Sequence, residues 1–405
     1  MKDDELLRVL ILTHRLPYAP NKGDRLRAYH MLRALHGVAD VDLVSLVHDA
    51  EEATHAGDLR PMVDRVVTLP VSRLSNLLRS VPALAGTRPL THVLLSSPRA
   101  RQAIAALIES RTPDVVLAFC SSMARLAFEP PLSGLPVVVD LMDVDSAKWR
   151  AMADASRWPL AAIYAREARY LARFERVIAQ KAAATLVVNT REQAALHEVD
   201  PTAEATVLEN GVDTAHFAAT APPTGRPTVI FTGVMDYAPN AQGAMWLARD
   251  IWPQVLRQRP DARLMLVGAS PGASLRSLPT RDASITVTGT VPSVREYLWD
   301  AAVAVAPLRI ARGVQNKVIE AVAAGVPCVI TSEVDAGLPP EVRPACHVCD
   351  SDAAFANAVV ELLARTPQER RALAARAHVS ALDWTARMRV LMPILEAAAS
   401  RSRAS

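Results

Sequence analysis

One stretch in the second half of the chain decides the fold. Residues 307–332 read Pro-Leu-Arg-Ile-Ala-Arg-Gly-Val-Gln-Asn-Lys-Val-Ile-Glu-Ala-Val-Ala-Ala-Gly-Val-Pro-Cys-Val-Ile-Thr-Ser. An apolar run over 303–308 overlaps its start, Gly313 supplies a flexible point, and Gly325 ends a helical pattern before Pro327 opens a second apolar run. The stretch therefore predicts a strand, a loop, a helix and a strand, which is the unit of a doubly wound sheet.

The two faces of this predicted helix differ in chemistry. Four apolar side chains share one face, and the opposite face carries Asn316, Lys317 and Glu320 among alanines. A solvated face would normally carry more charge and fewer alanines. We interpret it as a face against which a ligand packs, while an ordinary helix with a solvated Lys and Glu is the alternative.

The start of the helix has the properties of a nucleotide-diphosphate site. Unpaired N–H groups and the positive end of the helix dipole favour a phosphate. Arg309, Arg312 and Lys317 can bring full charges to the same anion. Glu320, one turn further along, can accept two hydrogen bonds from a ribose diol.

The stretch resembles the donor-site motif of the glycosyl transferases group 1 family, which has the GT-B fold. In that motif two Glu residues separated by seven others precede an Ala and a Gly-Pro turn. Glu320 matches the second Glu, which implies a contact with the donor ribose. Arg312 occupies the position of the first Glu, so the contact with the donor sugar is not implied. Lys317 resembles a Lys that takes part of the diphosphate charge in one branch of the family.

Four further segments resemble the family in the same order along the chain. Gly23 and Gly233 follow predicted strands, and the resemblance implies that their backbone approaches the donor phosphates. The backbone of Val291 is implied to pair with the nucleobase, and Asn210-Gly-Val-Asp resembles the end of the first domain. A plain turn glycine is the alternative for Gly23. The expected donor-binding set is Gly23, Gly233, Val291, Arg309, Gly313, Asn316 and Glu320, with Arg312 and Lys317 as the catalytic groups.

Length and alternation of apolar runs give the domain organisation. A chain of 405 residues is too long for one core and fits two domains. We predict two doubly wound Rossmann-like domains of class α/β: 1–217, a linker at 218–226, 227–381, and a C-terminal segment 382–405. The GT-B resemblance implies that the two domains face each other across a cleft and that the helix of the last segment crosses back to the first domain. Predicted strands cover 8–13, 41–47, 63–69, 114–119, 136–141, 184–188, 205–209, 228–232, 263–268, 284–288, 303–308, 328–331 and 346–349.

Composition excludes several classes of protein. Apolar content of 50%, charged content of 21% and a net charge of +3 are those of an ordinary globular protein and do not indicate a nucleic-acid partner. Four cysteines without framework spacing favour a reducing compartment. The acidic N-terminus is wrong for a signal peptide, and no run reaches the ~18 apolar residues of a membrane span. These features predict a cytoplasmic protein, at most attached to a membrane surface. The family resemblance implies that this surface is the cytoplasmic face of the inner membrane and that no cofactor is needed beside the nucleotide-sugar co-substrate.

Acidic residues follow the predicted strand 136–141 in the first half of the chain. Asp140 and Asp143 lie at its carboxyl end, where doubly wound sheets place their sites, so they are candidates for contact with an acceptor. Asp143 and Asp145 also form an Asp-x-Asp pair that could hold a divalent ion, but we expect Arg, Lys and helix ends to meet the charge, and no metal. The Arg-rich helical stretch 150–181 is either a solvated helix or a membrane-surface helix.

The combined motifs predict a glycosyltransferase that uses a nucleotide-diphosphate sugar and a lipid-linked or oligosaccharide acceptor. The opening loop, the segment 143–149 and Gly-Val-Gln-Asn-Lys resemble a narrower branch, the sugar transferases of bacterial exosortase and exopolysaccharide systems. The family mostly retains anomeric configuration, but the altered motif leaves the stereochemistry open. A nucleotide-sugar epimerase and a non-catalytic nucleotide-binding module are the alternatives. The sequence does not name the sugar, the base, the acceptor or the linkage.

Overall fold

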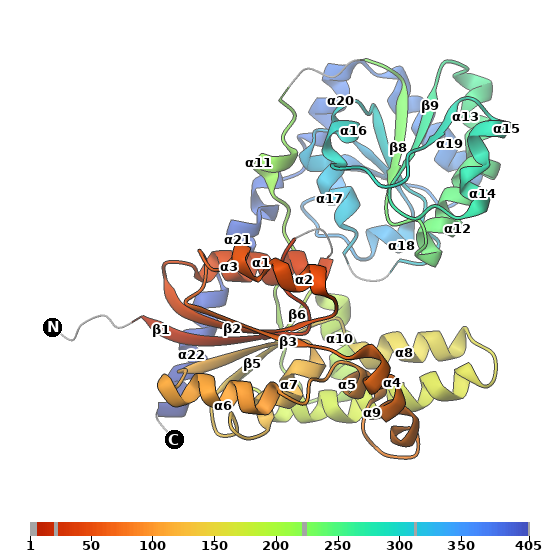
Figure 1. Cartoon of the computed structure of the whole chain (residues 1–405). Helices are drawn as coiled ribbons and strands as arrows, with labels where there is room; N and C mark the ends of the chain where they lie inside the picture. The colour runs from red at the N-terminus through yellow and green to blue at the C-terminus, as the bar shows by residue number, and fades with distance from the viewer. Residues whose placement is uncertain (1–5, 20–22, 221–224, 312–313, 404–405) are drawn as a thin grey trace. The chain divides into compact units, whose positions relative to one another are not determined.

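A computed structural model describes residues 6–19, 23–220, 225–311 and 314–403. The chain forms two compact units (Figure 1): one consists of Met1–Glu209 and Met388–Ser405, and the other of Asn210–Arg387. The boundaries expected at 217 and 382 therefore both fall inside the second unit.

Local contacts explain why the second unit begins before residue 217. The N–H of Val212 donates to the carbonyl of Leu382, and the hydroxyl of Thr214 donates to the Asp383 carboxylate. A Cβ on Gly211 would lie 2.6 Å from the Cα of Trp384, so only glycine allows this close approach. These contacts join the expected end of the first domain to the segment around 382–384.

The first unit is built on a seven-stranded parallel sheet with the order β3-β2-β1-β4-β5-β6-β7. Its central strands are continuous apolar runs, as expected for a parallel sheet that helices cover on both faces; in β4 all five residues are buried. The strands are β1 (Leu7–Thr13), β2 (Ala39–Val47), β3 (Arg65–Pro70), β4 (Val115–Phe119), β5 (Val137–Met142), β6 (Ala184–Val187) and β7 (Thr206–Val207). The helices are α1 (Gly23–Leu35), α2 (Ala50–Thr54), α3 (Ala56–Leu59), α4 (Arg73–Ala83), α5 (Leu90–Leu94), α6 (Ala100–Ser110), α7 (Ser121–Phe128), α8 (Asp145–Asp154), α9 (Leu160–Lys181), α10 (Thr190–Val199) and α22 (Leu391–Arg403).

The second unit repeats the plan with a six-stranded parallel sheet of order β10-β9-β8-β11-β12-β13. The strands are β8 (Thr228–Thr232), β9 (Arg263–Val267), β10 (Ile285–Val287), β11 (Val303–Ala306), β12 (Cys328–Ile330) and β13 (Cys346–Val348). The α-helices are α11 (Thr214–Phe217), α12 (Ala238–Trp246), α13 (Trp252–Gln258), α14 (Ala273–Arg276), α15 (Leu278–Arg281), α16 (Arg295–Trp299), α17 (Asn316–Ala323), α18 (Ser332–Asp335), α19 (Asp352–Ala364), α20 (Pro367–Ala374) and α21 (Trp384–Met388). A π-helical segment, Leu247–Ile251, joins α12 to α13, and short 3-10 turns cover Arg343–Ala345 and Val379–Leu382.

The predicted strands are all present, but two helical predictions are corrected. The stretch 150–181 is not one helix: α8 and α9 are separate helices packed against each other, and α9 begins directly after Pro159. Proline has no N–H and clashes with the preceding turn, so it favours a break at this position. The expected final helix is likewise divided into α21 and α22. As predicted, the last helix belongs to the first unit, where α22 contacts α1, β4 and β5.

Candidate functional site

The side chain of Asn240 joins the start of α17 to the loop that follows β8. The amino group of Lys317 donates a 2.6 Å hydrogen bond to Oδ1 of Asn240. Nδ2 of Asn240 in turn donates to the carbonyl of Val234 at 2.9 Å. The same amino group lies 4.8 Å from the ring centre of Phe231, close enough for a cation–π contact. Lys317 is therefore held at the carboxyl end of β8.

Gly233 ends this strand and leaves room for the two polar side chains. A Cβ built on Gly233 would lie 2.8 Å from Nδ2 of Asn240 and 3.2 Å from Nζ of Lys317. On the other side, a Cβ on Gly268 would come within 1.8 Å of the Gly233 carbonyl oxygen. Two glycine backbones thus meet at the carboxyl edge of the sheet, the edge at which doubly wound sheets bind ligands. The structure brings Gly233 and Lys317 together from different elements.

The charges on α17 are held in a partly buried setting. Burial lowers the pKa of Lys317 to about 8, although the nearby Glu320 acts in the opposite direction. Burial raises the pKa of Glu320 to about 7, and Lys317 opposes that rise. Both charged forms are disfavoured by incomplete solvation. A bound phosphate would favour charged Lys317, and hydroxyl donors would favour ionised Glu320.

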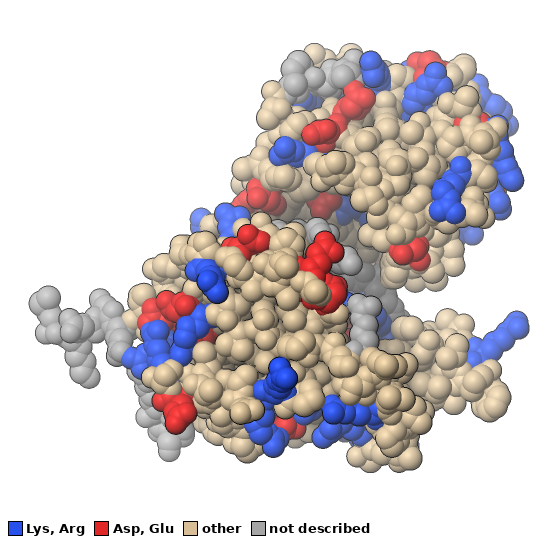
Figure 2. Space-filling view, viewed as in Figure 1, with Lys and Arg blue, Asp and Glu red and all other residues tan. Residues whose placement is uncertain are grey.

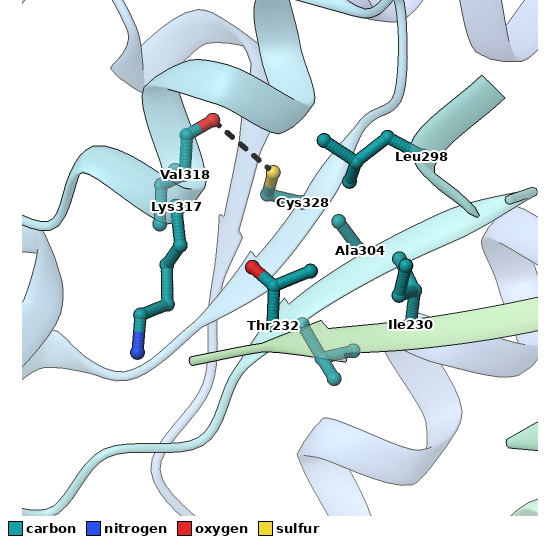
Figure 3. A pocket seen from close by; sticks show the side chains of 8 residues that line it. Ile230, Thr232, Leu298, Ala304, Lys317, Val318 and Cys328 are labelled. Carbon is teal, nitrogen blue, oxygen red and sulfur yellow. Dashed lines mark hydrogen bonds between the residues drawn. The ribbon is translucent and has the colours of Figure 1, made fainter. Parts of the chain in front are cut away.

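A small cavity lies beneath the helix start (Figure 3). Its volume is about 10 Å³, and its lining comes from β8, β11, β12, α16 and α17: Ile230, Thr232, Leu298, Ala304, Val305, Lys317, Val318 and Cys328. This space holds one water molecule at most. In Figure 3 the amino group of Lys317 points away from the apolar lining. The cavity therefore borders the stem of Lys317 and is far too small for a nucleotide.

Two more of the expected donor-binding residues have distinct surroundings. Oδ1 of Asn316, the first residue of α17, is buried without a hydrogen-bond partner among the described residues. This oxygen can accept a hydrogen bond from a ligand at the start of the helix. The guanidinium of Arg309 lies 4.3 Å from the ring centre of Trp246 and 3.9 Å from a carboxylate oxygen of Asp352. The structure thus gives Arg309 an aromatic and an acidic partner of its own.

The remaining donor-side residues are placed only in part. Arg312 and Gly313 lie outside the described residues. Val291 is half-buried against the core of the second unit, shortly after Gly289, whose φ of +72° favours glycine. Gly23 is the first residue of α1 in the first unit.

The surroundings of Asp140 correct the prediction that this residue contacts an acceptor. It is fully buried, and its oxygens accept hydrogen bonds of 2.6 and 3.1 Å from Nε and Nη2 of Arg27. Arg27 also donates to the carbonyl of Leu208 at 2.7 Å. The pair joins α1 to β5 and to the segment after β7. A carboxylate enclosed in this way does not offer its oxygens to an acceptor, so Asp140 is a structural residue.

Asp143 is half-buried, and Asp145 nearby shows the more unusual environment. Oγ of Ser121 donates to the Asp145 carboxylate at 3.2 Å, and Nε2 of His92 lies 3.4 Å from the same hydroxyl. Burial raises the pKa of Asp145, and the neighbouring Asp143 adds to the rise. Among the residues the structure describes, no group of three or more His, Cys, Asp and Glu side chains is arranged to hold a metal ion.

Sequence reasoning missed Asn240, which supplies the partner of Lys317. Its only signal was a position six residues beyond Val234, next to a proline, where an Asn is ordinary in a turn. The structure places it in the first turn of α12. The contact joins residues 77 positions apart, so it depends on the tertiary fold.

Comparison with known proteins shows one matching family and several similar solved structures. Residues 226–365 match the model of the family described as "Glycosyl transferases group 1". Solved structures are similar over nearly the whole chain. Anabaena HepE in complex with UDP has a TM-score of 0.67 at 12% identity, with 96% of this chain and 100% of that chain covered. The trehalose 6-phosphate synthase of Burkholderia multivorans has a TM-score of 0.65 at 12% identity, with 98% and 100% covered.

The fold is GT-B. TarM has the same architecture, with a TM-score of 0.64 at 10% identity and coverage of 97% and 99%. No curated protein matches the sequence. The family match lies within the second unit, where the chain is similar to group 1 glycosyltransferases, and the solved structures show the fold. The helices of the described segments include none with the length and apolar character of a membrane span.

Proposed function

We propose that the protein is a glycosyltransferase that moves a sugar from a nucleotide-diphosphate sugar to a lipid-linked or glycan acceptor. The observation that carries the proposal is the fixed position of Lys317 beside Gly233, with Glu320 one turn further along α17. The family match covers these residues, and a GT-B protein of similar structure, Anabaena HepE, has been crystallised with UDP-glucose.

The donor would be held by charge and by backbone. Lys317, with Arg312 as the second cation, would contact the diphosphate, and Gly233 would let the backbone of the β8 end approach it. Glu320 would accept hydrogen bonds from the ribose, and Val291 would pair with the base. Gly23, Arg309, Gly313 and Asn316 complete the proposed donor contacts.

The cations stabilise the diphosphate most strongly while its bond to the donor sugar breaks. The bond from the anomeric carbon to the phosphate oxygen cleaves, the electron pair goes to the leaving diphosphate, and the carbon gains oxocarbenium character. Lys317 stabilises the added charge on the leaving group, so its contribution is larger in the transition state than in the bound donor. The acceptor hydroxyl forms the new bond. In the retaining course that we propose, its proton passes to the leaving phosphate oxygen, so neither a protein base nor a metal ion is needed.

The proposed biological role is more specific than the fold alone can support. Its support is the resemblance of the segments 143–149 and 313–317 to sugar transferases of exosortase and exopolysaccharide systems. We propose envelope or exopolysaccharide glycan synthesis at the cytoplasmic face of the inner membrane. Asp143 is retained as an acceptor-side candidate, since its side chain is half-buried rather than enclosed.

Radiolabelled UDP-, GDP- and ADP-sugars, each incubated with and without a lipid-linked acceptor, test the proposal. Transfer of label to the lipid fraction is expected with one donor, and Lys317→Ala should lose it while the exposed Lys181→Ala keeps it. Release of a free epimerised sugar without an acceptor would establish the epimerase instead. Nucleotide binding without any turnover would leave a binding module.

A further inference from the structure

Helix α4 of the first unit presents a row of large apolar side chains to the outside. Leu74, Leu77, Leu78 and Val81 follow the spacing i, i+3, i+4 and i+7, which places them on one face. Their exposed fractions are 72%, 57%, 66% and 61%, respectively. Isolated exposed leucines are common, but four on one helix face form a patch that favours a partner. We call these four residues the α4 stripe.

Polar contacts on the other side of α4 hold the stripe outward. Asn76 is buried, and its Nδ2 donates to the carbonyls of Leu94 and Ser96 at 2.9 and 2.8 Å. At the end of the helix, Arg166 of α9 donates to the carbonyls of Ala83 and Leu84 at 2.6 and 2.8 Å. Turning the stripe inward would break these bonds. The outward orientation is therefore built into the first unit.

The segment that carries the stripe is strongly basic. Between Asp64 and Glu109 the sequence contains six Arg residues and no Asp or Glu. Arg79 on α4, Arg88 after it and Arg99 before α6 are exposed. The surface of the first unit around α4 in Figure 2 is mostly uncharged, with blue side chains beside it. Arg79 lies on the far side of α4 from the stripe, so the positive charge near the stripe comes from the exposed Arg88 and Arg99 of the same segment. An exposed apolar helix face in a segment whose charged residues are all arginines is a combination that binds an anionic lipid surface.

The same contacts argue against the Arg-rich stretch 150–181 as the lipid-facing surface. Arg166 donates to backbone carbonyls, and the buried Glu167 accepts from the N–H groups of Leu90 and Thr91 at the start of α5. The ring of Tyr170 lies 4.7 and 5.2 Å from the guanidinium groups of Arg166 and Arg173. The side chains of Arg166 and Glu167 on α9 are thus engaged in hydrogen bonds that hold the segment around α4 and α5.

A second copy of this chain fits the α4 surface less well than lipid. A two-fold contact brings the same patch of both copies together. It would bring the exposed Arg88 and Arg99 of the two copies to the same interface, with no acidic residue of 65–108 to pair with them. Charge complementarity therefore favours anionic lipid phosphates.

We propose that α4 docks the first unit onto an anionic lipid bilayer. The α4 stripe enters the boundary between headgroups and acyl chains, and Arg88 and Arg99 contact the lipid phosphates. This inference deepens the proposed function, because a lipid-linked acceptor is presented at such a surface. Vesicle binding is measured without donor or acceptor, so its outcome is separate from that of the transfer assay.

Flotation of the full chain with vesicles tests the docking surface. Wild-type protein should float with vesicles of phosphatidylcholine and phosphatidylglycerol, float weakly with phosphatidylcholine alone, and lose binding as salt is raised. Leu77→Asp combined with Leu78→Asp should reduce the bound fraction at least about tenfold, since two apolar side chains that would enter the bilayer become charged. Arg88→Glu should weaken binding to the anionic vesicles only.

Val38→Asp is the matched control, because Val38 is an exposed apolar residue of the same unit, 46% accessible, outside the α4 stripe. It should float as the wild type does. The circular dichroism spectrum and the urea-unfolding midpoints of the Leu77/Leu78 variant should match those of the wild type, which shows that the first unit is folded. Equal flotation of the wild type and the Leu77/Leu78 variant, or no flotation of the wild type, would overturn the proposal. A wild-type dimer that becomes monomeric in the variant would assign the surface to a second copy of the chain.

Discussion

A methyl group added at Gly233 tests the arrangement around Lys317. In Gly233→Ala the new Cβ would lie 2.8 Å from Nδ2 of Asn240, closer than van der Waals contact allows. Asn240 is held by its bonds to Lys317 and Val234 at 2.6 and 2.9 Å, so it relieves the overlap only by weakening them. The substitution should therefore act through Asn240.

The size of the effect follows from the bonds at risk. A hydrogen bond that involves a charged group contributes about 1.5–3 kcal/mol, and a neutral one about 0.5–1.5 kcal/mol. Partial loss of both predicts that Gly233→Ala lowers the free energy of unfolding by about 1–3 kcal/mol. In an Asn240→Ala background the crowded atom is absent. The same methyl group should then cost less than about 0.5 kcal/mol, which is the ordinary error of additivity.

These four proteins, the wild type, both single variants and the double variant, form a double-mutant cycle. Urea denaturation measures the free energy of unfolding of each. Nucleotide affinity, measured by calorimetry on the same four proteins, should show the same non-additive pattern because Lys317 depends on Asn240 for its position. An additive cycle, in which Gly233→Ala costs as much in the Asn240→Ala background as it does beside the native asparagine, would refute the reasoning.

Three further predictions concern the chemistry of the site. Lys317→Ala should lower turnover at least about tenfold, or about 1.4 kcal/mol of barrier, beyond its effect on donor affinity, and steady-state kinetics that show a normal kcat would remove Lys317 from the mechanism. Donor affinity should rise as pH passes about 7, where Glu320 ionises, and fall above about 8, where Lys317 loses its proton. Calorimetry from about pH 5.5 to 9.5 measures both limbs; Lys317→Arg should abolish the alkaline limb because arginine stays charged, and a flat wild-type profile would contradict the assignment. Activity should survive EDTA, whereas loss on chelation with recovery on manganese would indicate a metal site at Asp143 and Asp145.

The strands of both sheets could be predicted from the sequence because parallel strands are buried on both faces and therefore appear as apolar runs. Runs such as Val-Val-Leu-Ala-Phe over 115–119 leave no other place for their side chains than the interior. Helix α17 was equally accessible, since Asn316, Lys317 and Glu320 are close in sequence and the helical period places them on one face. Its start at Asn316 and its end before Gly325 follow the expected signals.

Contacts between distant segments were outside the reach of a local pattern. Asp140 stood at a strand end, where a ligand contact is a reasonable expectation, but its partner Arg27 lies 113 positions away and encloses it. Asn240 could not be connected to Lys317 for the same reason. The leucines of α4 have the spacing of a core helix, and only the structure shows that their face is exposed.

The most direct test of the central claim, that α17 forms a nucleotide-sugar site, is a calorimetric titration of Glu320→Gln. The wild type should bind one of the UDP-, GDP- or ADP-sugars, and the variant should bind it about 10- to 100-fold more weakly, which corresponds to the loss of about 1.5–3 kcal/mol from hydrogen bonds to a charged group. Glu333→Gln, an exposed acid of the same unit on α18, is the matched control and should bind as the wild type does. Unchanged binding by Glu320→Gln, or no binding of any nucleotide-sugar by the wild type, would contradict the account.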